Sequence, residues 1–159
     1  MGRRAESGHA LIEVTLGLTF LAVALLGIFA AASSSLKLSR TTTDTQAALT
    51  AIRAQLAEMR ARPYATVLAS YEGAGFDVPG LVRRPGDATA GRIRFLNEAE
   101  TATRWGTAAD LDGDGVAWEV EAPHAGFRIL PVRVEVDWRD EGGDRHVEVH
   151  AIVYSPEGT

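Results

Sequence analysis

The stretch that decides the fold is GHALIEVTLGLTFLAVALLGIFAAA, residues 8–32, which follows a short basic leader. Within it, Glu13 is the only residue that carries a full charge at neutral pH. A helix of about 20 apolar residues is long enough to cross a bilayer. A carboxylate inside such a helix is costly, and it marks a functional site by default. We therefore predict a membrane-spanning helix over residues 9–32, with Glu13 as a functional residue near its start.

The composition limits what the remaining chain can be. The 159 residues carry a net charge of −5 and include no cysteine. Once the leader and the apolar helix are set aside, roughly 125 residues remain, which is enough for one modest core. An acidic part with scattered basic residues gives no electrostatic footprint for nucleic acid, so no nucleic-acid partner is expected. Without cysteine, a disulfide framework, a thiol nucleophile and a Cys-ligated metal are excluded.

The N-terminus resembles the class III leader of type IV prepilins. Arg3 and Arg4 lie in a short leader that ends in Gly8, and Glu13 is the fifth residue of the apolar helix that follows. His9 departs from the family, which usually has Phe or Met there. The resemblance implies that a prepilin peptidase cuts after Gly8 and methylates the new amine of His9. It also implies that Glu13 of one subunit pairs with that amine on a neighbour in a filament, which sets the register between subunits.

Two simpler interpretations of the same stretch are an ordinary secretory signal and an uncleaved signal anchor. The small residues Ala30-Ala31-Ala32-Ser33 could serve as a signal-peptidase site. Glu13 disfavours both interpretations, because a carboxylate there weakens membrane insertion.

Residues 33–63 are expected to form the amphipathic half of the same helix. The low helix propensity of residues 41–44 (TTTD) predicts a weak interruption. Arg62-Pro63 predicts the end of the helix, because the residue before a proline avoids the α conformation. Apolar residues at spacings of 3, 4 and 3 form one stripe that should pack on a sheet: Leu49, Ile52, Leu56 and Met59.

Residues 64–159 read as a globular α+β head with an antiparallel sheet. Residues 64–91 predict an irregular connection with a short helical turn near 66–70, and residues 92–95 alternate as a short strand. Residues 127–138 predict a strand that buries alternate residues, and 139–143 a glycine-containing hairpin loop before a return strand. The helix end and this hairpin also resemble minor pilins and pseudopilins of the PilV and GspI types. That similarity favours a minor subunit.

Residues 110–121 (DLDGDGVAWEVE) satisfy the D-x-D-x-D-G-x5-E pattern of a calcium loop. Alternate carboxylates can converge on one hard cation, and Gly115 permits the sharp turn between them. The alternation over Val116–Val120 predicts a strand, however, which would place the last ligand along a strand and not on an exiting helix. The alternative is an acidic turn with solvated carboxylates. The candidate Ca2+ ligands are Asp110, Asp112, Asp114, the carbonyl of Val116, and Glu121.

Catalytic chemistry is not expected. His146 and His150 lie on a predicted strand, where they would be about 13 Å apart and too distant to share a metal. No nucleophile elbow, phosphate loop or zinc-hydrolase motif occurs in the sequence.

We therefore predict an α+β pilin fold, with a long N-terminal helix packed on a C-terminal antiparallel sheet. The expected role is a structural subunit, minor rather than major, of a type IV pilus or a type II secretion pseudopilus. The expected partners are a prepilin peptidase, other pilin or pseudopilin subunits, and an inner-membrane assembly platform. The protein would cross the inner membrane once, with its head outside the cytoplasm, before it enters a periplasmic or surface filament. The rival interpretation is a signal-anchored extracytoplasmic calcium-binding domain that does not polymerise.

Overall fold

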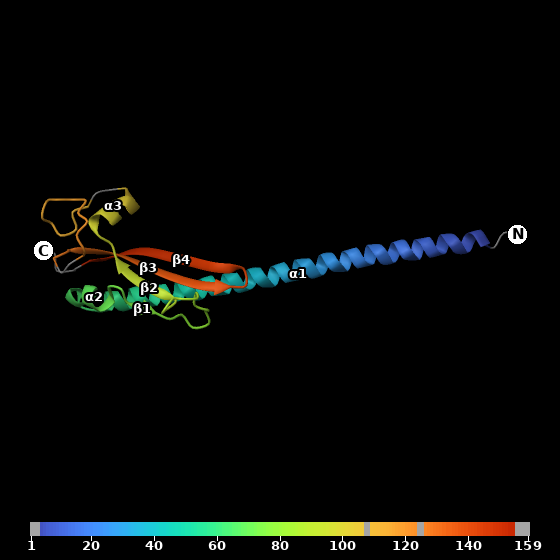
Figure 1. The fold of residues 1–159 in the computed structure, drawn as a ribbon, viewed down its shortest axis with the longest axis horizontal. Helices are drawn as coiled ribbons and strands as arrows, with labels where there is room; N and C mark the ends of the chain where they lie inside the picture. The colour runs from blue at the N-terminus through green and yellow to red at the C-terminus, as the bar shows by residue number, and fades with distance from the viewer. Residues whose placement is uncertain (1–3, 107–108, 124–125, 155–159) are drawn as a thin grey trace. The chain divides into compact units, whose positions relative to one another are not determined.

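The computed structural model describes residues 4–106, 109–123 and 126–154, and of residues 4–10 it describes the backbone alone. The chain divides into two compact units, Met1–Thr42 and Thr43–Thr159. Figure 1 shows the elements along the chain, from the long helix α1 to the hairpin of β3 and β4. The start of the predicted leader, residues 1–3, lies outside the described residues.

Helix α1 runs without a break over Arg4–Ala61, a length of 58 residues. The predicted interruption at residues 41–44 is therefore wrong. The hydroxyl of Thr41 donates to the carbonyl oxygen of Lys37 at 3.1 Å, and the next threonine makes the same bond one residue on. Because these hydroxyls bond to carbonyl oxygens of the preceding helical turn, they do not compete with the helix for its backbone hydrogen bonds, and the helix continues. The helix ends before Pro63, as the sequence predicts.

The C-terminal part of α1 packs on the sheet through one apolar face. Ile52 and Met59 are fully buried and Leu56 nearly so, and they join the same core as the strands. The predicted stripe is thus confirmed at these three positions. At its start the stripe shifts by one residue, because Ala48 is fully buried whereas Leu49 is half-buried.

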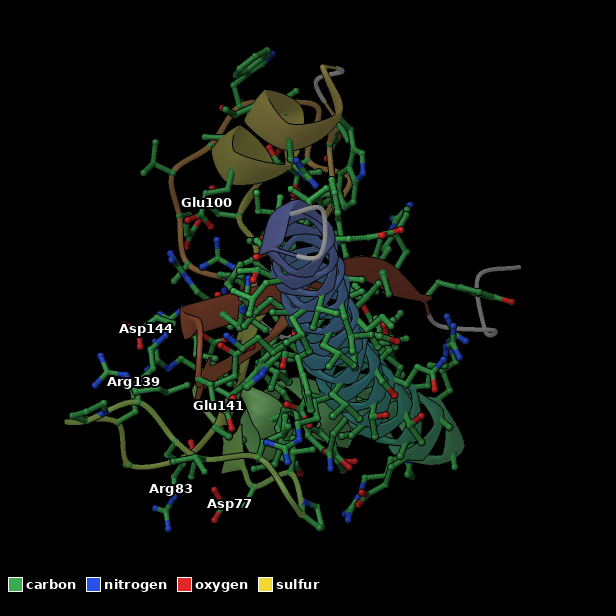
Figure 2. The ribbon with its side chains drawn as sticks, turned by 90° about the vertical axis from the view of Figure 1, so that its right-hand side faces the viewer. Asp77, Arg83, Glu100, Arg139, Glu141 and Asp144 are labelled. Carbon is green, nitrogen blue, oxygen red and sulfur yellow. The ribbon has the colours of Figure 1, made fainter. Side chains whose placement is uncertain are left out.

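One four-stranded antiparallel sheet follows, in the order β1-β2-β3-β4. The predicted hairpin is confirmed, but its loop is shorter than expected, because pairing extends to Asp140 opposite Gly143. Arg139 and Asp144 face each other across the hairpin end, with Nε 2.8 Å from Oδ1 (Figure 2). The strands are β1 (Gly75–Phe76), β2 (Gly91–Phe95), β3 (Ile129–Asp140) and β4 (Gly143–Tyr154).

The two faces of the sheet have different chemistry. On β3, Val134, Val136 and Trp138 are buried in the core shared with α1. The alternate residues point to the opposite face, which we call the outer face, as the two-residue period of a strand requires. The outer face carries ion-paired side chains from three strands: Arg92, Arg94, Arg133, Glu135, Asp137, His146, Glu148 and His150.

Two short helices complete the structure. α2 (Tyr64–Tyr71) confirms the predicted helical turn near 66–70, whereas β1 lies within the stretch predicted to be irregular. α3 (Glu98–Trp105) has no counterpart in the sequence prediction. Asn97 and Glu100 cap its N-terminus reciprocally, and Gly106 ends it at φ 72°. The predicted α+β class, with a long N-terminal helix on an antiparallel sheet, is confirmed.

Candidate functional site

The first candidate site is the apolar part of α1. Every side chain from Leu11 to Arg40 is exposed, including Phe20 and Phe29 at 68% and 69%. The helix is long and apolar enough to cross a membrane, although a signal sequence near an N-terminus would pass the same test. Exposed apolar surface on this scale requires lipid or another protein to cover it.

Four hydroxyls of this segment are satisfied within the helix. The hydroxyls of Thr15 and Thr19 donate to carbonyl oxygens four residues back, at 2.6 and 2.8 Å, and Ser33 and Ser34 do the same at 2.8 and 3.0 Å. Such internal bonds are what a lipid environment demands. Glu13 is exposed, and none of the side chains that the structure describes pairs with it. Its carboxylate therefore needs a partner from outside the described chain if the segment enters lipid.

Gly8 and His9 lie within the helical backbone of α1. Their surroundings lie outside the part of the chain whose side chains the structure describes. Cleavage after Gly8 and methylation of His9 therefore stay predictions.

The second candidate site is the acidic loop, residues 110–121. Asp110 accepts hydrogen bonds from the backbone N–H groups of Gly113 and Gly115, at 2.5 and 2.9 Å. These bonds, above all the one from Gly115, hold the pKa of the Asp110 carboxyl below its usual value. Asp112 and Asp114 each accept the N–H two residues ahead, at 3.1 and 2.7 Å. Gly115 adopts φ 94°, so the predicted need for glycine at this turn is confirmed.

Glu98, the first residue of α3, holds this loop in place. Its side chain is 1% exposed, and its two carboxylate oxygens accept the backbone N–H groups of Leu111 and Glu119. The N–H of Ala99 also donates to the carbonyl oxygen of Glu119 at 3.1 Å. Leu111 points inward and is buried in the core. The backbone of the loop is therefore held by Glu98 and by the buried Leu111, and the acidic side chains of the loop point away from the core.

Two groups of carboxylates come together in the loop and share Asp112. Glu98, Asp110 and Asp112 form one group and Asp112, Asp114 and Glu119 the other, with one oxygen of each residue within 4.8 Å of the others in its group. Partial burial and the charges of Asp114 and Asp112 raise the pKa of Glu119. A divalent cation would relieve this repulsion, but exposed acidic groups also occur without one. Calcium binding therefore stays a prediction.

The end of the acidic loop differs from the sequence expectation. The predicted strand over Val116–Val120 is wrong, because the described residues from 116 to 123 contain no strand. Trp118 has φ 78°, which bends the chain, and Asn97 Nδ2 donates to the carbonyl oxygen of Val120. The segment is thus tied to α3. Within the described residues, Glu121 belongs to neither carboxylate group. Glu119, which is not a ligand position of the calcium-loop pattern, joins Asp112 and Asp114 instead.

The histidines of β4, His146 and His150, both lie on the outer face of the sheet. Both face the carboxylate of Glu148: Nε2 of His146 is 3.7 Å from Oε2, and Nε2 of His150 is 3.3 Å from Oε1. Among the described residues, they do not form part of a carboxylate–histidine group close enough to hold a metal ion.

Comparisons of the chain with protein-family models, with curated proteins and with solved structures gave no match.

Proposed function

We propose that this chain is a structural subunit of a type IV pilus or of a type II secretion pseudopilus. The observation that carries the proposal is the exposed apolar surface of residues 11–32, which has a single carboxylate, Glu13, near its start. A bundle of similar helices would cover this surface, as would lipid before assembly. The remainder of α1 is amphipathic and packs on an antiparallel sheet, which gives the subunit a folded head.

In this proposal the prepilin peptidase cuts after Gly8 at the cytoplasmic face and methylates the amine of His9. Removal of Arg3 and Arg4 takes away the basic residues that hold the leader at that face. The Glu13 carboxylate then pairs with the amine of a neighbouring subunit. An unpaired carboxylate in an apolar bundle costs several kcal/mol, so this pairing selects the axial stagger of the helices.

The proposed location follows from the same steps. The subunit crosses the inner membrane once, with its head outside the cytoplasm, and an inner-membrane assembly platform transfers it into the filament. We propose a minor subunit on the resemblance of the helix end and the C-terminal hairpin. Its role is assembly rather than catalysis.

The test is replacement of Glu13 in cells that contain a prepilin peptidase and the filament system. Glu13→Leu and Glu13→Gln should be processed and should insert at least as well as the parent chain, because they remove a charge from the membrane. Their amount in sheared filaments should fall at least tenfold. Glu58→Gln is the matched control, because this exposed α1 carboxylate already has a partner in its own chain, Arg62, at 2.9 Å. Equal incorporation of the parent and both Glu13 variants would refute the proposal.

A second candidate function is favoured by the convergence of carboxylates in the acidic loop. A signal-anchored, calcium-binding extracytoplasmic domain would need that loop but not Glu13. It would stay monomeric with or without the Glu13 replacement, and calcium would protect the loop from proteolysis.

A further inference from the structure

The segment that follows the acidic turn, residues 116–120, lies outside the sheet and exposes apolar side chains to solvent. Val116, Trp118 and Val120 are 52%, 55% and 78% exposed, while Ala117 and Glu119 between them are half-buried. This two-residue alternation is that of an extended segment with its apolar side facing outward. Neighbouring exposed apolar side chains of this kind, rimmed by polar residues, mark an interaction surface.

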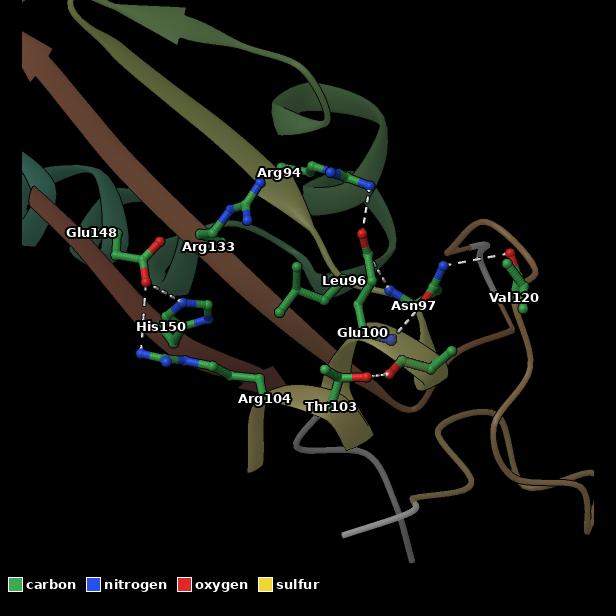
Figure 3. A pocket seen from close by; sticks show the side chains of 11 residues that line it. Arg94, Leu96, Asn97, Glu100, Thr103, Arg104, Val120, Arg133, Glu148 and His150 are labelled. Atoms are coloured by element: carbon green, nitrogen blue, oxygen red, sulfur yellow. Dashed lines mark hydrogen bonds and ion pairs between the residues drawn. The ribbon is translucent and has the colours of Figure 1, made fainter. Parts of the chain in front are cut away.

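The backbone of this segment is fixed by hydrogen bonds to helix α3 and its N-cap. The N–H of Glu119 donates to the Glu98 carboxylate at 3.3 Å, and the carbonyl oxygen of Glu119 accepts the N–H of Ala99 at 3.1 Å. The carbonyl oxygen of Val120 accepts a hydrogen bond from Nδ2 of Asn97 at 3.4 Å (Figure 3). The exposed side chains are thus presented on an ordered backbone, which lowers the entropy cost of binding a partner.

Trp118 lies at the centre of this surface. Its φ of 78° is a conformation that a bulky residue rarely adopts. Such a backbone persists only where the surrounding contacts impose it, as the bonds of Glu119 and Val120 to α3 and its N-cap do here. More than half of the Trp118 side chain is nevertheless left in solvent. Tryptophan is enriched among the residues that contribute most to the binding energy of protein interfaces.

The charge around the segment is negative. Residues 110–121 contain five carboxylates and no lysine or arginine. Arg128 lies against Gly113 in the same loop, but neither it nor any other described residue forms an ion pair with Glu119 or Glu121. Both carboxylates flank exposed apolar side chains in the sequence, so a partner that covers these side chains also meets uncompensated negative charge.

This charge selects among the possible occupants. Partial burial and the charges of Asp114 and Asp112 raise the pKa of Glu119, so a cationic group nearby would relieve a repulsion that already exists. The same surface of a second copy carries the same negative charge, which disfavours pairing of two copies face to face.

We propose that this surface docks a partner protein through an extended segment that combines basic and apolar side chains. The apolar side chains pack on Trp118 and Val120, and the basic ones pair with Glu119 and Glu121. Arginine suits the second task, because its guanidinium group pairs with carboxylates and also stacks on an indole ring. The docking surface uses neither Glu13 nor the apolar helix, so it is a second interaction site of the chain.

The probe is the blocked peptide acetyl-Arg-Leu-Arg-Leu-amide, titrated at pH 7 into the full chain in detergent micelles with calcium chelated. Binding is followed by the backbone amide signals of residues 116–121. In acetyl-citrulline-Leu-citrulline-Leu-amide, neutral groups of nearly the same shape replace the guanidinium groups. In acetyl-Arg-Gly-Arg-Gly-amide, the charges stay and the apolar side chains are removed. We expect the Arg-Leu peptide to bind at least tenfold more tightly than either control peptide.

Trp118→Gly removes the ring and suits the φ of 78°, and it should lower the affinity for the Arg-Leu peptide at least tenfold. Val82→Ala is the matched control, because Val82 is an apolar residue outside this loop that is 66% exposed, and it should leave the affinity unchanged. Glu121→Gln provides a second variant if the first one disturbs the loop, and it should lower the affinity at least threefold.

Three results would assign the surface differently. Equal binding of the citrulline peptide would show an apolar surface without charge selection, and equal binding of the Arg-Gly peptide would show diffuse electrostatic attraction. Self-association of the chain in sedimentation, if Trp118→Gly abolishes it, would show that a second copy occupies the surface. Any of these results, or no binding of the Arg-Leu peptide, would overturn the proposal.

Discussion

Replacement of Glu98 will release the acidic loop from α3 and destabilise the second unit of the chain, Thr43–Thr159. Glu98 is 1% exposed and accepts two backbone N–H groups, those of Leu111 and Glu119. Glu98→Ala removes both acceptors, whereas Glu98→Gln keeps one oxygen acceptor and turns the other into a donor. The order of stability should be parent, glutamine variant, alanine variant.

The magnitude follows from the bonds that are lost. A hydrogen bond to a charged group contributes about 1.5–3 kcal/mol, so two of them contribute about 3–6 kcal/mol before water replaces them. Because water can enter once the side chain is shortened, we expect a net loss of about 3 kcal/mol for Glu98→Ala and about 2 kcal/mol for Glu98→Gln. These are large fractions of the 5–15 kcal/mol that typically stabilises a folded domain.

The assay is urea unfolding of the full chain in detergent micelles, with calcium chelated. At a slope of about 2 kcal/mol per molar urea, the two losses shift the midpoint down by about 1.5 M and 1 M. Hydrogen exchange provides the local measurement: a loss of about 3 kcal/mol makes the Leu111 amide exchange roughly 100-fold faster. Glu121→Ala, an exposed carboxylate in the same loop, should change the stability by less than about 0.5 kcal/mol.

The reasoning is refuted if Glu98→Ala and Glu121→Ala have the same unfolding midpoint. It is also refuted if the exchange of the Leu111 amide stays unchanged in Glu98→Ala, because the loop would then be held by other contacts.

Other predictions concern the core, the hairpin and the acidic loop. Ile52→Ala should lower the free energy of unfolding by about 3 kcal/mol, since Ile52 is fully buried, while Thr50→Ala on the exposed face changes it little; equal urea midpoints would contradict this. The Arg145 guanidinium holds the pKa of the Asp140 carboxyl below 3.8, so their pairing stabilises the hairpin above that pH and is lost as the pH falls through the lowered pKa. The stability difference between the parent and Arg145→Met should therefore shrink at acid pH, and a constant difference would exclude this linkage. If the loop binds calcium, calcium will slow proteolysis of the loop, and Asp112→Asn will abolish that protection. If calcium does not protect the parent chain, the loop is an acidic turn with solvated carboxylates and not a calcium site.

The hydrophobic pattern made the main elements predictable. Ile52 and Met59 recur at helical spacing, and Val134, Val136 and Trp138 alternate, so the period of each pattern identified the buried face. These faces must meet, because together they form the core. The α+β class followed from these local patterns, and the resemblance of the N-terminus to prepilins implied the arrangement of a long helix on the sheet.

Helix α3 was missed although its end signals are present. Asn97 with Glu100 three residues later, and Gly106 at the end, are the residue types of a capping box and a C-terminal stop. The segment between them has few apolar residues, so the periodic signal was weak. The burial of Glu98 also could not be foreseen, because it depends on the backbone of a loop more than ten residues further along the chain.

The acidic loop shows where a motif ceases to determine geometry. The calcium-loop pattern correctly indicated that Asp110, Asp112 and Asp114 lie in one tight turn, because backbone N–H groups two or three residues further along the chain bond to their carboxylates. It could not place Glu119 or Glu121, because their positions depend on the bend at Trp118 and on contacts with α3. Long-range contacts of this kind leave no periodic trace in the sequence.

The most direct test of the proposed function is the intact mass and N-terminal sequence of the protein from membranes that contain a prepilin peptidase. The account predicts a chain that begins at His9 and carries a methylated amine. A chain that begins at Met1 would indicate a plain anchor, and one that begins near Ser33 a secreted domain. Either of these two results would contradict the assignment to a filament.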